Sequence, residues 1–141
     1  MIRFSSVLIL LAAACAPPER RASDAGWNGT YRCPAPTTTT GDPAAWSGEF
    51  KSAFVLQVTD AALAIGNLGC PRWSDAGVIG CGPTSFSGDG PDASCDWRLW
   101  MELSGAWIDG GRVLSLQQEA DCILPDGGWD RVEGVALCRL P

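Results

Sequence analysis

The sequence predicts an all-β fold, a small antiparallel meander that closes into a barrel or forms a two-sheet sandwich, cross-linked by about three disulfides. Apolar residues occur in short alternating runs separated by turn residues, as expected for antiparallel strands with one buried face. The 17 glycines and 10 prolines are spread along the chain and leave no convincing amphipathic helix. The seven cysteines in 141 residues are typical of a small exported domain.

The expected strands alternate clearly in the first half of the chain. Tyr31 and Cys33 share one face of the first strand, and Phe54, Leu56 and Val58 share one face of the second. The segment 34–43, rich in threonine and proline, is expected to be a loop. The expected strands are residues 27–33, 52–58, 62–65, 77–81, 84–87, 96–108, 112–119 and 131–140.

The clearest hairpin joins the strands at 96–108 and 112–119. Its apolar face and its opposite face alternate: Trp97, Leu99, Met101 and Leu103 against Arg98, Trp100 and Glu102. Asp109-Gly110-Gly111 supplies residues that tolerate the positive φ angles of a tight turn. A last hairpin is expected to turn at 125–128. The strands at 77–81 and 84–87 are expected to flank a glycine-rich loop.

Six cysteines lie in the expected domain: Cys33, Cys70, Cys81, Cys95, Cys122 and Cys138. Zinc sites normally use clustered ligands, whereas this chain has no CxxC pair and no histidine, so disulfides are favoured over a metal site.

The expected strands suggest three pairings of these cysteines. Cys95 and Cys122 lie at similar distances from the 109–111 turn and face each other in that register. Cys33 meets Cys138 if the sheet closes on itself, and Cys70 with Cys81 then clips a loop.

The chain begins with a short apolar run, residues 7–14, preceded by a single charge, Arg3. It is too short to cross a bilayer, which takes about 20 residues, and has the length of a signal-peptide core. The string Leu11-Ala-Ala-Ala-Cys15 resembles the lipobox of bacterial lipoproteins, with Ala12 where leucine is commonest. The open alternative is cleavage by the general signal peptidase after Ala14 or Ala16.

The lipobox resemblance implies a signal peptide at 1–14 and acyl chains such as palmitate on Cys15. The Pro pair and the lack of apolar periodicity after Cys15 favour a flexible tether at 15–26, which is followed by the expected β-domain at 27–141. The resemblance also implies an outer-membrane destination, because Ala16 carries no inner-membrane retention signal. Cysteine parity adds an independent argument, since lipidation of Cys15 leaves an even number of cysteines for disulfides.

Charge and composition restrict the chemistry. A formal net charge of −6 argues against nucleic acid as a partner. The absence of histidine excludes Ser-His-Asp and Cys-His catalysis. Asp89, Asp92 and Asp96 form a weak calcium candidate, with a plain solvated turn as the alternative. No cofactor is expected.

Seven tryptophans are an excess for so small a domain. Trp97 belongs to the apolar face and is expected in the core. Trp100 shares its face with Arg98 and Glu102, and Trp73 and Trp129 lie beside expected turns, so these three are the candidate ligand-binding residues. The alternative is that tryptophan merely fills the core of a domain with few other aromatics.

The start of the domain, with Trp27 and Tyr31 leading into Cys33, is loosely similar to lipocalin-like barrels, although Gly26 directly precedes Trp27 and the G-x-W motif is not met. This likeness implies a barrel shape. The sequence favours a lipid-anchored, non-enzymatic cell-envelope binding module for a small molecule, a glycan or a protein such as an envelope protease. A structural or interaction component of the envelope is the alternative, and a carboxylate-dependent hydrolase is a weaker one.

Overall fold

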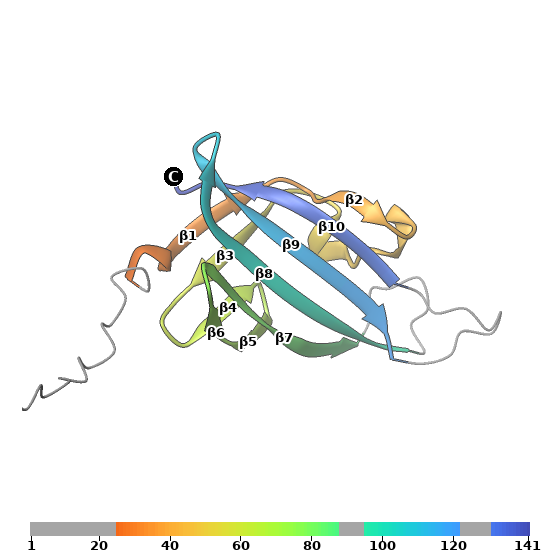
Figure 1. Ribbon diagram of the computed structural model, residues 1–141. Helices are drawn as coiled ribbons and strands as arrows, with labels where there is room; N and C mark the ends of the chain where they lie inside the picture. Colours follow the sequence, from red (N-terminus) through yellow and green to blue (C-terminus); the bar gives the residue numbers. More distant parts are fainter. Residues whose placement is uncertain (1–24, 88–94, 122–130) are drawn as a thin grey trace, which may run out of the picture.

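The computed structural model describes residues 25–87, 95–121 and 131–141, which form two antiparallel β-sheets (Figure 1). One sheet has the order β1-β3-β4-β5 and the other the order β2-β10-β9-β8-β7-β6. The elements are η1 (Ala25–Trp27), β1 (Gly29–Cys33), β2 (Thr37–Thr40), η2 (Pro43–Ala45), η3 (Gly48–Phe50), β3 (Phe54–Val58), β4 (Ala62–Ile65), β5 (Leu68–Pro71), β6 (Trp73–Asp75), β7 (Val78–Ser87), β8 (Asp96–Ile108), β9 (Gly111–Ala120) and β10 (Arg131–Cys138).

The core lies between the sheets and follows the predicted alternation. In β3, Phe54, Leu56 and Val58 are buried while the residues between them are exposed. In β8, Trp97, Leu99, Met101 and Leu103 are all fully buried. The all-β prediction is therefore confirmed, and within the described ranges the only helices are the short 3-10 turns η1, η2 and η3.

The β8–β9 hairpin turns where the sequence predicts. Asp109 has a φ of 50° and Gly110 a φ of 75°, the left-handed geometry that a two-residue hairpin turn requires. Next to this turn Trp107 lies opposite Arg112. The register shifts between Trp107 and Leu103, and beyond the shift Leu103 lies opposite Leu114 and Trp97 opposite Ala120.

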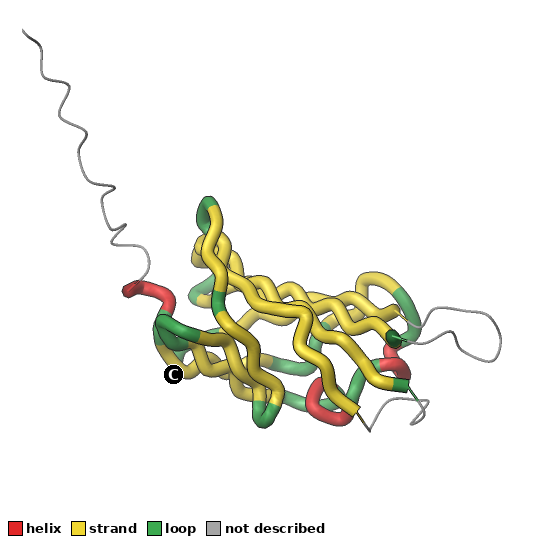
Figure 2. Tube along the Cα trace, turned by 90° about the horizontal axis from the view of Figure 1, so that it is seen from below, coloured by secondary structure: helices red, strands yellow, loops and turns green. Residues whose placement is uncertain are grey.

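The barrel prediction, and with it the lipocalin-like shape, is wrong, because the two sheets do not close on each other. The strands that would close the barrel already have neighbours: β10 pairs with β9 and β2, and β7 pairs with β8 and β6. Only an isolated bridge between Arg32 and Arg139 joins the backbones of β1 and the segment after β10. The fold is the sandwich alternative (Figure 2).

Two predicted disulfides join the sheets at opposite edges. Cys33 of β1 is bonded to Cys138 of β10, and Cys70 of β5 is bonded to Cys81 of β7. Because β1 and β5 are the two edge strands of the four-stranded sheet, both of its edges are covalently attached to the larger sheet. Cys95 is also disulfide-bonded, and its predicted partner Cys122 lies outside the described residues.

Several element predictions need correction. The expected loop at 34–43 contains β2, an edge strand of four threonines whose two faces are both largely solvated, so no apolar alternation marks it. The expected strands at 77–81 and 84–87 are one strand, β7, with a register shift between Cys81 and Thr84 in place of a loop. Strands β5 and β6 were not predicted, because each is only a few residues long.

Some predictions fall on residues that the structure does not describe. These are the signal peptide, Cys15 and nearly all of the tether, the turn at 125–128, and Asp89, Asp92, Cys122 and Trp129. In the described part of the chain, no helix is long and apolar enough to span a bilayer.

Tyr31, the one tyrosine of the chain, is fully buried, and its hydroxyl donates to the carbonyl oxygen of Trp27 at 2.9 Å. Burial raises the pKa of the Tyr31 phenol above its usual 10.0, while the charges of Arg112 and Arg72 act in the opposite direction. Above pH 10 the unfolded chain therefore loses this proton before the folded one does. Stability is unaffected by this group below pH 10 and falls as the pH rises through the folded-state pKa.

We expect the absorbance of the tyrosinate in native protein to appear at higher pH than in denatured protein. A Tyr31→Phe variant should lose about 1 kcal/mol at neutral pH through the missing hydrogen bond. It should also show a shallower loss of stability above pH 10. Equal alkaline slopes for the variant and the parent protein in urea denaturation would contradict this assignment.

Candidate functional site

The candidate site lies on the outer face of the six-stranded sheet. Because side chains alternate along a strand, Arg98, Trp100 and Glu102 of β8 point away from the core. Strand pairing continues each of them across β9 and β10. The three resulting rows are Arg98–Glu119–Arg131, Trp100–Gln117–Glu133 and Glu102–Ser115–Val135.

A groove of about 310 Å³ lies over the second and third rows. We call it the Trp100 groove, and its lining residues are Thr39, Trp100, Glu102, Ser115, Leu116, Gln117, Glu133, Gly134 and Val135. Leu116 and Gly134 occupy inward-facing positions, so they contribute backbone to the bottom of the groove. Thr39 comes from the edge strand β2, at the register shift between β2 and β10.

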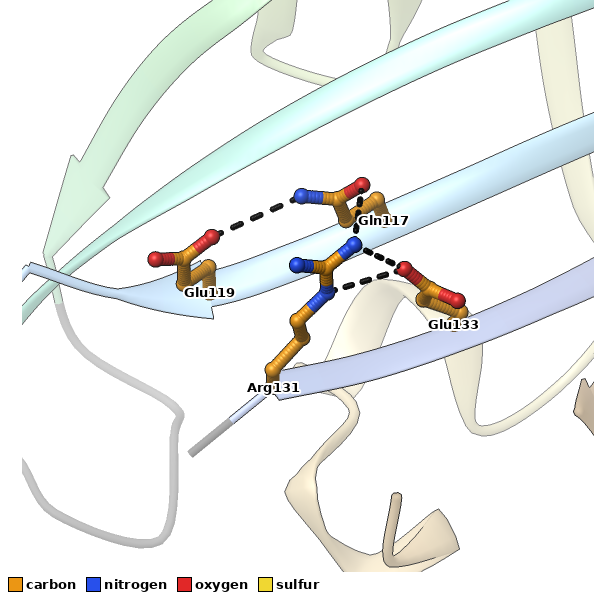
Figure 3. Close-up of polar contacts among 4 residues, drawn as sticks. All are labelled: Gln117, Glu119, Arg131 and Glu133. Carbon is orange, nitrogen blue, oxygen red and sulfur yellow. Dashed lines mark hydrogen bonds and ion pairs between the residues drawn. The ribbon is translucent and has the colours of Figure 1, made fainter. Parts of the chain in front are cut away.

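A hydrogen-bonded network orients two polar side chains of the groove (Figure 3). Nε of Arg131 donates to Oε1 of Glu133 at 2.8 Å, and Nη2 of Arg131 donates to the same oxygen and, at 3.1 Å, to Oε1 of Gln117. Nε2 of Gln117 in turn donates to Oε2 of Glu119 at 3.5 Å. Ion pairs this exposed add little stability, so their consequence is orientation of Gln117 and Glu133.

Trp100 is half-buried and is held from the side by Arg98. The guanidinium carbon of Arg98 lies 5.5 Å from the centroid of the Trp100 ring, and Nη2 of Arg98 lies 3.6 Å from Oε1 of Glu119. Arg98 and Arg131 therefore both lie in the first row, at one end of the groove, bound to carboxylates. Glu102, at the other end, makes no ion pair with any residue that the structure describes.

The structure brings two of the three candidate tryptophans to one face. Trp73 pairs with Gly80, and Gly80 pairs with Glu102, so these three residues share one face of the sheet. The Trp73 ring lies directly over Gly80, where a Cβ atom would have no room. Trp73 is thus on the outer face beside the third row, but it does not line the Trp100 groove. Trp129 lies outside the described residues.

The calcium candidate has one described member. Asp96 is exposed at the start of β8, while Asp89 and Asp92 are not described. Within residues 25–87, 95–121 and 131–141, no three metal-ligating side chains come together.

The residues that line the groove beside Trp100 were not among the predicted site residues. The outward-facing positions of β9 and β10 in the groove are Ser115, Gln117 and Glu133. In β9 these positions could have been found from the sequence, because they alternate with the apolar residues Leu114 and Leu116. Thr39 had no such signal, since its segment was expected to be a loop. A second hollow lies beside Glu49 and Gly66 near β3, and Glu49 is the one charged residue among its described lining residues.

Comparison of the chain with protein-family models, with curated proteins and with solved structures gave no significant match. The function of the chain is therefore inferred from the Trp100 groove itself.

Proposed function

We propose that this protein is a lipid-anchored cell-envelope binding protein without catalytic activity, and that the Trp100 groove holds a short glycan. The observation that carries the proposal is the row Trp100–Gln117–Glu133, which places a half-exposed indole beside an oriented amide and an oriented carboxylate. Trp97 is fully buried in the core, whereas Trp100 lies on the outer face within the groove, where its indole is accessible to a ligand.

The groove matches the chemistry of a sugar ring. A pyranose has an apolar face of C–H groups that packs on an aromatic ring, and a rim of hydroxyl groups that donate and accept hydrogen bonds. The amide of Gln117 and the carboxylate of Glu133 supply planar donors and acceptors, and Ser115 and Thr39 add hydroxyl groups. Pockets that hold small ligands commonly combine an apolar wall with a few oriented polar groups.

Charge narrows the class of glycan. The groove contains two carboxylates, Glu102 and Glu133, and the chain carries a formal net charge of −6. Like charges repel, and Glu102 has no compensating cation among the described residues. Neutral sugars and amino sugars are therefore favoured over acidic ones such as uronic acids.

Tryptophan fluorescence tests the proposal. We expect chitotriose or its deacetylated form to change the emission saturably, and trigalacturonic acid to bind at least about tenfold more weakly. A Trp100→Ala variant should no longer bind the sugar in isothermal titration calorimetry, which does not depend on the indole as a reporter, because the apolar platform is removed. Gln117→Ala, which leaves the core untouched, should weaken binding by about fivefold to tenfold through one lost hydrogen bond.

Trp73→Ala is the matched control, since Trp73 lies on the same face outside the groove. Its binding should equal that of the parent protein. If Trp73→Ala abolishes the response while Trp100→Ala retains it, the Trp100 groove is not the site. If neutral, amino and acidic oligosaccharides all leave the emission unchanged, the glycan proposal fails.

The lipid anchor is supported by the sequence at Cys15, and the two disulfides between the sheets support export to an oxidising compartment. We expect fatty-acid labelling of the protein in a bacterial host to disappear in a Cys15→Ala variant. A Cys33→Ala variant should keep the label. Continued labelling of Cys15→Ala would exclude Cys15 as the acylated residue.

A further inference from the structure

The third row of the outer face continues on both sides of the Trp100 groove. Glu102 pairs with Gly80 of β7, and Gly80 pairs with Trp73 of β6. On the other side, Val135 pairs with Thr37 of β2. The third row therefore crosses all six strands of the sheet, a width of about 24 Å at the usual spacing between strands.

The indole of Trp73 lies against the backbone of β7. A Cβ atom on Gly80 would be 2.3 Å from Cζ2 and 2.7 Å from Cε2 of Trp73, so only glycine leaves room for the ring there. The ring thus extends from β6 over β7 toward β8, while Trp73 as a whole stays 40% exposed. An indole that rests on a sheet and keeps this much accessible surface is an aromatic platform.

Along the described third row, no bulky side chain separates Trp73 from the groove. Gly80 has no side chain, and the next residue of the row, Glu102, is exposed and already lines the groove. Gly82 of β7, also without a side chain, lies against Trp100, where a Cβ atom would be 3.2 Å from Cδ1 of the ring. The surface between the two indoles is therefore open above β7.

We propose that Trp73 is a second sugar subsite, so that the protein binds long glycans more tightly than short ones. This inference rests on the proposed function of the Trp100 groove. The groove spans the strands from β8 to β2, about 14 Å, and Trp73 belongs to a strand about 10 Å beyond that of Trp100. A trisaccharide in the groove is expected to leave Trp73 free, whereas a hexasaccharide has twice the length and reaches both indoles.

The two contacts reinforce each other. Once the groove holds one end of a long glycan, the contact of the other end with Trp73 becomes intramolecular and adds to the affinity.

The charge of the second subsite agrees with that of the groove. Asp75 is two residues from Trp73 on β6 and, like Glu102, makes no ion pair with any residue in the described ranges. Carboxylates at both places repel acidic sugars. The occupant of the whole row is therefore a neutral or amino glycan.

Isothermal titration calorimetry of the full chain with chitotriose and chitohexaose tests the second subsite. A hexasaccharide presents several overlapping trisaccharide stretches to the groove, which alone raises the affinity about fourfold. We expect the parent protein to bind chitohexaose at least about twentyfold more tightly than chitotriose, with one glycan per protein. In ¹⁵N-labelled protein, chitohexaose should shift the indole N–H signal of Trp73, which chitotriose leaves in place.

Variants separate the second subsite from the groove. Trp73→Ala should reduce the gain to about fourfold and leave the affinity for chitotriose unchanged, which also shows that the variant is folded. Trp73→Phe, which keeps an aromatic ring, should retain part of the gain. Ile108→Ala is the matched control, because Ile108 is 46% exposed but ends β8 at the hairpin turn, and it should bind both glycans like the parent protein.

The second subsite is excluded if the parent protein binds chitohexaose no more than about fourfold more tightly than chitotriose, or if Trp73→Ala keeps the full gain. Saturable binding of chitotriose at Trp100 together with either result would leave the proposed function intact. If neither glycan binds, the proposed function fails and the second subsite fails with it.

Discussion

A variant with both Cys33→Ala and Cys138→Ala is expected to lose about 4 kcal/mol of its free energy of unfolding. This disulfide closes a loop with a sequence separation of 105 residues, and removing it frees the unfolded chain from that constraint. It also attaches an edge of the four-stranded sheet to β10, where the backbone adds only the Arg32–Arg139 bridge. A domain of this size has about 5–15 kcal/mol in total, so the variant should be close to unfolding at 37 °C.

The matched control is Cys70→Ala with Cys81→Ala, at the opposite edge. Its sequence separation is 11 residues, so the same reasoning predicts a loss of about 2–3 kcal/mol. Urea denaturation of the three proteins measures both losses. An equal loss for the two variants, or a larger loss for the shorter loop, would contradict the loop-closure account.

Gln118 is expected to be the most sensitive polar residue of the core. It is fully buried, Oε1 accepts from the backbone N–H of Ser47 at 3.0 Å, and Nε2 donates to the carbonyl oxygen of Ala45 at 2.7 Å. These bonds attach the end of η2 and Ser47, which precedes η3, to β9. Gln118→Met keeps the volume but leaves two buried backbone groups without partners, at a cost of about 2–4 kcal/mol.

The neighbouring Gln117→Met is the control, because Gln117 faces outward and bonds only to side chains at the surface. It should change the free energy of unfolding by less than about 0.5 kcal/mol. Equal costs for the two substitutions would mean that the Ser47 and Ala45 bonds do not stabilise the fold.

The sequence predicts those strands that have one face buried in the core and the other face in contact with solvent. The alternation in β3 and β8 and the Asp109-Gly110 turn follow directly from residue type. The Cys33–Cys138 pair was predicted on the assumption of a closed barrel. The pairing is confirmed although the barrel is wrong, because a disulfide needs only neighbouring strands and not a continuous sheet.

Other elements carry no such signal. Strand β2 is a row of threonines at a sheet edge, so its pattern is polar throughout. Gly82 and Pro83 were expected in a loop but lie within β7, at its register shift. The η2–η3 segment buries Trp46 and Phe50, whose rings meet edge to face at 5.4 Å. The segment has neither the period of a helix nor that of a strand, so its sequence does not predict this burial.

The candidate site was predictable in part. The outward position of Trp100 follows from alternation in β8, whereas the row Trp100–Gln117–Glu133 also requires the register between β9 and β10. Trp73 was grouped with Trp100, and the pairing of β6 with β7 places it on the same face but outside the groove. Such registers depend on strand order, which no single stretch of sequence specifies.

The most direct test of the binding proposal is an NMR titration of ¹⁵N-labelled protein with chitotriose, followed at the indole N–H and side-chain amide signals. We expect the signals of Trp100 and Gln117 to move together and saturate, while those of Trp73, Trp97 and Trp107 stay in place. Saturable shifts at Trp73 or Trp107 with Trp100 unmoved, or no shift at any indole, would contradict the binding proposal.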